Sequence, residues 1–294
     1  MRNILKKHPL IAFFVFFLIL FCFFLIYLFR SVTSEGTVSL ALGERVEIIE
    51  IEGVIVQSKE VVDQISKARK NDRVKGVIIR INSPGGGVAP SQEIYSELIK
   101  LRKEKKVVAS LSSIAASGGY YIASATEKII SNPGTLTGSI GVIMDFSNVE
   151  GLFEKVGVKN YVVKSGKFKD IGSPVREMTT EEKGLLQSVI GNVHRQFVSA
   201  IVEGRGMDEA DVIKVADGRI FSGEQALDYG LVDQLGTLQD SIDEVAEMAG
   251  IEGEPKVVYS EKKKGLIEYI LGSSSTSKIY EQLMMPQLMY LAPL

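Results

Sequence analysis

The sequence has very few of the side chains on which thiol, metal and imidazole chemistry depend. It contains one cysteine, Cys22, two histidines, His8 and His194, and no tryptophan. A single cysteine inside an apolar run can neither form an internal disulfide nor serve a folded domain as a thiol nucleophile. A site for a metal ion made of His and Cys is disfavoured for the same reason. We therefore expect neither a metal nor another cofactor.

A surplus of charge of one sign is also missing. The formal net charge is −2, and Lys and Arg alternate with Asp and Glu along the chain. A nucleic-acid-binding domain usually carries a one-sided basic stripe. The composition thus gives no reason to expect a nucleic-acid partner.

One long apolar run is present, from Leu10 to Phe29, and it has about the twenty residues that a helix needs to cross a bilayer. Basic residues are concentrated before it, at Arg2, Lys6 and Lys7, with only Arg30 close behind. This bias predicts a single-pass anchor in the cell (inner) membrane, with residues 1–9 in the cytoplasm and the rest of the chain outside. The alternative is a secretory signal cleaved near Ser39 and Ala41, but the apolar cores of signal peptides are usually shorter.

Beyond a linker at residues 30–45, the pattern predicts one α/β domain over residues 46–250 and a peripheral tail at 251–294. Short runs rich in Val and Ile are typical of strands buried on both faces, and the gaps between them show helical spacing of apolar residues. Strands are expected at 46–56, 74–82, 107–112, 128–131, 139–146, 158–164 and 219–222. Helices are expected near 58–68, 91–101, 207–216, 223–229 and 237–249, together with a long one that begins at Thr179 in a capping box with Glu182.

A glycine turn, Asn82-Ser83-Pro84-Gly85-Gly86-Gly87, follows the second expected strand. Glycines allow a tight turn that presents bare N–H groups, which can bind an oxyanion or a phosphate. The alternative is an ordinary turn. The segment lacks the Lys-Ser/Thr ending of a phosphate-binding loop, so a nucleotide site is disfavoured.

Ser117 lies between Ala116 and Gly118 where a strand passes into a helix. A hydroxyl there is uncrowded, and the N–H of Gly118 together with one from the glycine turn can stabilise a tetrahedral oxyanion. The segment therefore predicts a serine nucleophile. The competing explanation is a close helix contact that merely needs small residues.

A serine nucleophile needs a base, and His194 lies in the middle of a helix, where a structural role is the better interpretation. A lysine can serve when its amine is neutral, as in Ser–Lys variants of the catalytic triad. Lys164, Lys167 and Lys169 share one loop, and the charge of Asp170 would oppose deprotonation there. Spacing does not choose among the three, and each can also be a solvated surface charge.

Four segments, SPGGG, AASGGYYIAS, TGSIGVI and SGKFKDIGSPVREMTTEE, resemble the short-form signal peptide peptidase A family in order and spacing, from about Val46 to Ala246. The resemblance implies a ClpP/crotonase-like α/β fold of repeated ββα-type units. It further implies that Ser117 is the nucleophile and Lys169 the general base, that Ser139 orients the lysine, and that Gly86 is an oxyanion donor. The N–H of Gly118, expected from the Ser117 segment, would complete the oxyanion hole.

The same resemblance implies a serine endopeptidase that works through an acyl-enzyme intermediate. Its expected substrates are signal peptides left in the membrane, and its expected assembly is a ring-shaped homo-oligomer whose active sites are shared between protomers. Three alternatives remain: an acyl-coenzyme A enzyme of the crotonase type, a membrane protease that cuts a stomatin-like partner, and a catalytically inactive scaffold.

Overall fold

The computed structural model describes residues 16–24, 44–261 and 289–291, and the chain divides into two compact units, residues 1–43 and 44–294. In the first unit, residues 16–24 are helical and their apolar side chains are exposed. No helix among the described residues is long and apolar enough to cross a membrane. The other residues of the expected anchor, 10–15 and 25–29, lie outside the described ranges, as do the N-terminal segment 1–9 and the linker up to residue 43.

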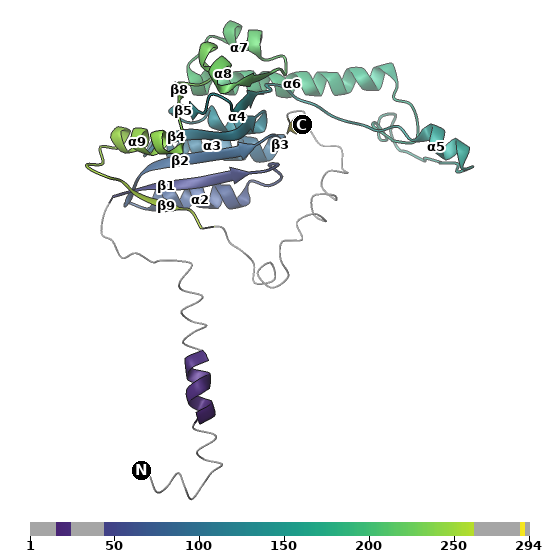
Figure 1. Ribbon diagram of the computed structural model, residues 1–294. Coiled ribbons are helices and arrows are strands. Elements are labelled where there is room, and N and C mark those ends of the chain that lie inside the picture. The colour runs from purple at the N-terminus through teal and green to yellow at the C-terminus, as the bar shows by residue number, and fades with distance from the viewer. Residues whose placement is uncertain (1–15, 25–43, 262–288, 292–294) are drawn as a thin grey trace, which may run out of the picture. The chain divides into compact units, whose positions relative to one another are not determined.

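The second unit is built on a mostly parallel β-sheet (Figure 1). Its order is β7-β6-β4-β2-β1-β9, β5 pairs with β4 and β8, and only the β6–β7 pairing is antiparallel. Strand β4 pairs with β5 through its first half and with β6 through its last residues, so the sheet divides at β4. The strands are β1 (Arg45–Glu52), β2 (Val74–Ser83), β4 (Lys106–Ala116), β5 (Lys128–Ser131), β6 (Leu136–Gly138), β7 (Ile220–Ser222), β8 (Gln234–Leu235) and β9 (Lys256–Tyr259).

Both faces of the sheet are buried, because alternate residues of each strand point to opposite sides. On one face Ile49 and Ile79 belong to the main hydrophobic core, which includes residues of α2 (Lys59–Lys70), α3 (Val88–Leu101), α4 (Gly118–Ala123) and α6 (Thr180–Arg205). On the other face Ile48 and Ile78 pack in a smaller cluster with residues of α9 (Leu238–Met248). The Val- and Ile-rich runs predicted this two-sided burial.

Three further helices complete the described part: α5 (Glu150–Lys155), α7 (Glu209–Val215) and α8 (Gly223–Asp228). The capping box predicted at Thr179 and Glu182 is confirmed at the start of α6, and Gly206 ends that helix in the left-handed conformation. The apolar contacts of α6 with the core lie in its second half, since Phe197 and Ile201 belong to the core whereas Leu185 is exposed. In Figure 1, α5 lies near the N-terminal end of α6 and α7 near its C-terminal end.

Two expected strands are wrong. The strand expected at 139–146 is replaced by β6, which ends at Gly138, because Gly138 and Ser139 both have positive φ and break the extended chain. Residues 158–164 form no strand; their side chains are exposed, and no described strand pairs with them. The first strand is shorter than expected, since it ends at Glu52 before a turn at Gly53.

The sheet also extends beyond residue 250, where the sequence pattern placed the end of the domain. Strand β9 pairs in parallel with β1, with Val257 opposite Val46. A second short sheet joins β3 (Gly85–Gly87) and β10 (Met289–Leu291). The segment at 251–294 therefore contributes strands to both sheets of the described chain, and a wholly peripheral tail is excluded.

Candidate active site

Ser117 lies at a sharp turn between β4 and α4. Its backbone angles, φ 52° and ψ −114°, are strained for a residue with a side chain, and such strain is concentrated at functional sites. The residue is fully buried, and its Oγ has no hydrogen-bond partner among the described residues. A buried hydroxyl without a partner is costly and needs an explanation. A group from a substrate or from another chain would supply one.

Ser139 lies next to this turn. The N–H of Ser117 donates to the carbonyl of Gly138 at 2.8 Å, and Ala116 is paired with Gly138 in the sheet. Ser139 follows at once with φ 49°, and its N–H donates to Arg219 O at 2.7 Å. The two serines are the non-glycine residues with positive φ in the described chain. The structure thus brings Ser117 and Ser139 to neighbouring strand ends.

The glycine turn lies against the other side of the Ser117 turn. A Cβ atom on Gly118 would lie 3.2 Å from Gly86 N and 2.7 Å from Ser91 Oγ, so the backbones of Gly118 and Gly86 are in close contact. Gly118 is the first residue of α4, and helix-start N–H groups have no partner within the helix. Ser83 Oγ, which accepts from Gly85 N at 3.1 Å, shapes the turn.

Strand β3 presents the N–H and C=O of Gly86 along an edge that pairs with an extended chain. Ile55 bonds to Gly85 O and Gly87 N, each at 2.8 Å, so the intervening peptide groups of Gly86 face the opposite edge. Along that edge β10 runs antiparallel, with Tyr290 opposite Gly86. A Cβ on Gly86 would lie 2.6 Å from Ile55 N, so only glycine fits. A peptide segment can therefore be held against the Ser117 turn.

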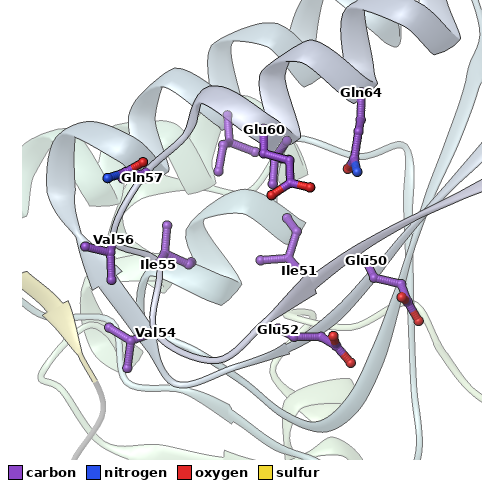
Figure 2. A pocket seen from close by; sticks show the side chains of 11 residues that line it. Glu50, Ile51, Glu52, Val54, Ile55, Val56, Gln57, Glu60 and Gln64 are labelled. Carbon is purple, nitrogen blue, oxygen red and sulfur yellow. The ribbon is translucent and has the colours of Figure 1, made fainter. Parts of the chain in front are cut away.

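A cavity of about 400 Å³ lies on the Ile55 side of the same turn (Figure 2). It is lined by Glu50 and Glu52 from β1, by Ile55, and by Glu60 and Gln64 from α2. Gln64 is buried, and its Oε1 has no partner among the described residues, while its Nε2 donates to Glu261 O at 3.2 Å. Its lining does not include Ser117, so this cavity is separate from the serine turn.

The three candidate lysines have different surroundings. Lys164 Nζ donates to Asp170 Oδ1 at 2.5 Å, and Lys167 pairs with Glu181 of α6. Lys169 is exposed, and its side chain makes no ion pair with the residues that the structure describes. Among the three, Lys169 is therefore the lysine whose amine is left available.

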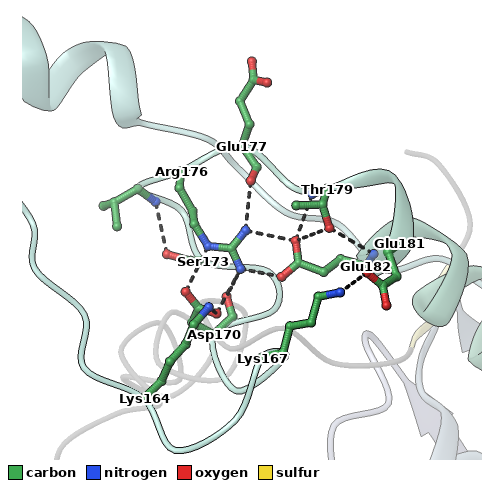
Figure 3. Close-up of polar contacts among 10 residues, drawn as sticks. Lys164, Lys167, Asp170, Ser173, Arg176, Glu177, Thr179, Glu181 and Glu182 are labelled. Carbon is green, nitrogen blue, oxygen red and sulfur yellow. Dashed lines mark hydrogen bonds and ion pairs between the residues drawn. The ribbon is translucent and has the colours of Figure 1, made fainter.

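Arg176 fastens this loop to the start of α6, as Figure 3 shows. Its guanidinium donates to Asp170 Oδ2 and Oδ1 at 2.9 and 3.0 Å and to Asp170 O at 3.1 Å. It also donates to Glu182 Oε2 at 2.9 Å, while Glu182 accepts from Thr179 N at 2.8 Å within the capping box. One side chain thus links the residue after Lys169 to the first turn of the helix.

This network lowers the pKa of both carboxyl groups. Hydrogen bonds from Arg176 and then Lys164 hold the pKa of Asp170 far below its ordinary value. The pKa of Glu182 falls to about 2 because Arg176 and the Thr179 N–H donate to it. In return, Glu182 and Asp170 raise the pKa of Arg176. All three groups are charged at neutral pH.

His194 is separate from these groups. Its Nε2 lies 2.8 Å from Ala216 O, so the ring joins α6 to the end of α7. This is the structural role that its position within a helix predicted. Among the described residues, no cluster of His, Cys, Asp and Glu can hold a metal ion.

Comparison with known proteins identifies the family. The model of peptidase family S49 matches residues 99–252, more than half of the chain, and that of Clp protease matches residues 36–135. The chain belongs to peptidase family S49. It is accordingly a serine protease with a ClpP/crotonase-like α/β fold. This assignment replaces two alternatives from the sequence, the acyl-coenzyme A enzyme and the inactive scaffold.

Individual proteins similar to this chain also carry the names of proteases. The chain is 43% identical over 234 residues to "Putative protease slr0021" of Synechocystis sp., covering 79% of this chain and 84% of the relative. It is 34% identical over 258 residues to "Putative signal peptide peptidase SppA" of Enterococcus faecium, covering 83% and 75%. A third relative, "Putative protease MJ0651" of Methanocaldococcus jannaschii, is 36% identical over 75% of this chain and 73% of its own length.

The structure of this S49 peptidase brings Ser117, Ser139, Gly86 and Gly118 together, while Lys169 lies on the exposed loop before α6. Sequence reasoning missed Arg176. A signal was available, because Arg176 precedes a capping-box glutamate by six residues and follows Asp170 by six. The sequence did not, however, predict how the loop folds to bring Arg176 to Asp170 and Glu182.

Proposed function

We propose that this S49 peptidase is a membrane-anchored endopeptidase that degrades remnant signal peptides, with Ser117 as nucleophile and Lys169 as general base. The observation that carries the proposal is the Ser117 turn: a strained, buried serine whose Oγ has no partner among the described residues, beside the amides of Gly86 and Gly118. The E. faecium relative carries the name of a signal peptide peptidase.

In this mechanism the neutral amine of Lys169 takes the proton from Ser117 Oγ as the oxygen attacks the peptide carbonyl. The N–H groups of Gly86 and Gly118 stabilise the negative oxygen of the tetrahedral intermediate. The C–N bond then breaks, and the leaving amine takes the proton from Lys169. Water hydrolyses the resulting ester by the reverse sequence, with Ser139 orienting the lysine.

Lys169 is proposed to act on Ser117 of a neighbouring protomer in a ring-shaped oligomer. Supporting this, Ser117 Oγ lacks a partner within the described chain, and the region before α6 exposes apolar side chains that another protein surface would cover. Those side chains are Ile143, Leu152, Val156, Val158, Tyr161 and Val163.

The membrane location is also part of the proposal. It rests on the apolar run of residues 10–29, with the basic residues that precede it, and on the helical conformation of residues 16–24. An anchor in the cell membrane with the catalytic domain outside would confine enzyme and signal peptide to one bilayer. Labelling of cysteines placed at residue 4 and residue 60 in intact cells tests it: only the second should react with an impermeant maleimide, and labelling of both or of the first alone would reject this topology.

The deciding experiment measures cleavage of a quenched-fluorescent signal peptide by the full chain in detergent. Ser117→Ala and Lys169→Ala should reduce the rate to background, while Ser96→Ala and Lys167→Ala, an exposed serine and the neighbouring lysine, should retain it. Activity in Ser117→Ala would reject the nucleophile. A stomatin-like protein is offered as substrate in parallel. Faster cleavage of that protein would favour the alternative protease function and reject signal peptides as the main substrate.

Mixing the two inactive variants tests the shared site. If Ser117 and Lys169 come from different protomers, co-assembled Ser117→Ala and Lys169→Ala chains should recover about a quarter of the wild-type rate, since random mixing pairs two intact residues that often. No recovery in demonstrably mixed rings would mean that each chain supplies both residues.

A further inference from the structure

Asp170 presents a chemical difficulty for a lysine base. It is the next residue after Lys169, and a carboxylate near an ammonium group favours the protonated form, which cannot accept a proton. A base at position 169 therefore needs the neighbouring negative charge to be engaged elsewhere.

The structure shows how Asp170 is engaged. Arg176 donates to both of its carboxylate oxygens, at 2.9 and 3.0 Å, and Lys164 donates to Oδ1 at 2.5 Å. Bidentate pairs of this kind fix geometry as well as charge. Both oxygens of Asp170 thus face cations other than Lys169, and the Asp170 side chain is half-buried on the Arg176 side of the loop.

Arg176 is itself held from the other side. Glu182 accepts from it, and Glu182 is almost fully buried in the capping box of α6. The exposed fraction of the Arg176 side chain is 28% and that of Glu182 is 3%. The buried carboxylate of Glu182 therefore holds the guanidinium in place beside Asp170.

Charged side chains of the loop that carries Lys169 also have partners other than Asp170. Lys167 pairs with Glu181, and Arg176 also donates to the main-chain carbonyl of Glu177. The segment before α5 packs here through Phe146, which contacts Gly172. The other charged residues of the loop and of the first turn of α6 are Lys164, Lys167, Arg176, Glu177, Glu181, Glu182 and Lys183, and Asp145 precedes Phe146 in the sequence.

We propose that Arg176 is a positioning residue that sequesters the carboxylate of Asp170, so that Lys169 is free to lose its proton and act as the base. This inference rests on the proposed function of Lys169. It assigns to Arg176 an effect on the pH dependence of catalysis and none on the binding of substrate.

The test compares pH profiles of kcat for peptide cleavage by the full chain in detergent. Arg176→Gln should lower kcat at neutral pH by roughly tenfold or more and move the acidic limb of the profile to higher pH, because an unneutralised carboxylate favours the protonated, inactive form of a lysine base. KM should change little. The double variant Arg176→Gln/Asp170→Asn should move the limb back, since it removes the released carboxylate.

Arg69→Gln is the matched control. Arg69 also bridges two carboxylates, Glu97 and Glu104, with a side-chain exposure of 27%, but it lies on α2. It should leave the profile unchanged. A uniform loss of kcat in Arg176→Gln at every pH, with no recovery in the double variant, would show a purely structural role and overturn the proposal.

Asp170→Asn alone keeps the test decisive if Arg176→Gln fails to assemble. The proposal expects most of kcat to remain, with the acidic limb in place or slightly lower, whereas a requirement for the Asp170 charge would reduce kcat across the range and overturn it. Lys169→Ala distinguishes the two proposals. Activity in Lys169→Ala would refute Lys169 as the base. If Lys169→Ala is inactive but Arg176→Gln leaves the acidic limb unmoved, only the role of Arg176 is refuted.

Discussion

The N–H of Ser117 donates to the carbonyl of Gly138 at 2.8 Å, and this bond joins the two strand ends that carry Ser117 and Ser139. It forms where β4 has left β5 and pairs with β6. The turn that presents Ser117 is therefore held from the sheet, through β6, as well as from α4. The positions around it should tolerate little change.

Gly86→Ala should abolish peptidase activity. The added Cβ would overlap the main chain of Ile55, and backbone cannot move aside as a flexible side chain can. Strand β3 would be displaced, and with it the amide proposed to stabilise the oxyanion. Gly134→Ala, at a loop position with open space, is the control. Equal activity in both variants would contradict the placement of β3.

Removal of the residues after 288 should increase kcat/KM for peptides by several-fold. Strand β10 occupies the edge of β3 that faces Ser117, so a substrate must compete with it for the same main-chain partners. The comparison is between the full chain and a chain that ends at residue 288, measured on the same peptide at low concentration. An unchanged or smaller kcat/KM would show that β10 does not obstruct the site.

Gly204→Ala should destabilise the protein by about 1–3 kcal/mol, the usual cost of inserting a methyl group into a packed contact. Its Cβ would overlap the carbonyl of Ser124, where α6 crosses the end of α4. Gly184→Ala, in the same helix with nothing within 4 Å, should stabilise by about 0.5–1 kcal/mol through helix propensity. Chemical denaturation measures both, and changes of the same sign would refute the contact.

Glu182→Gln should cost stability at neutral pH but not in strong acid. The pKa of Glu182 is lowered to about 2 in the folded chain, from about 4.3 in an unfolded one, so its contribution is complete above the unfolded value and is lost as pH falls through the folded value. The difference in free energy of unfolding between the two proteins should therefore shrink between about pH 4.5 and 2. A constant difference across that window would mean that the charge of Glu182 contributes nothing.

The sequence predicted the parts of this protein that local pattern determines. Short runs rich in Val and Ile predicted the buried strands, and the Thr179–Glu182 pair predicted the start of α6. Residues 158–164 have the composition of a strand, but a strand also needs a partner, and the described chain offers none there. Pattern alone cannot supply that second requirement.

The site shows the same limit. Ser117 and the glycine turn stand out because small residues at a strand end leave a visible signature. The positive φ of Ser139 depends on how β6 meets β7, and the bridge made by Arg176 depends on how a loop folds back on a helix. Both arise from long-range geometry, so the resemblance to a family located Ser139 while nothing located Arg176.

Glu182 caps α6 and also binds Arg176, which holds the loop that carries Lys169. Helix ends open more often than the strands of a core, because fewer contacts oppose their fraying. Each opening of the first turn of α6 would release Arg176 and loosen the loop, although the sheet stays intact. We therefore expect this enzyme to lose activity at a temperature below its melting point and to regain that activity on cooling.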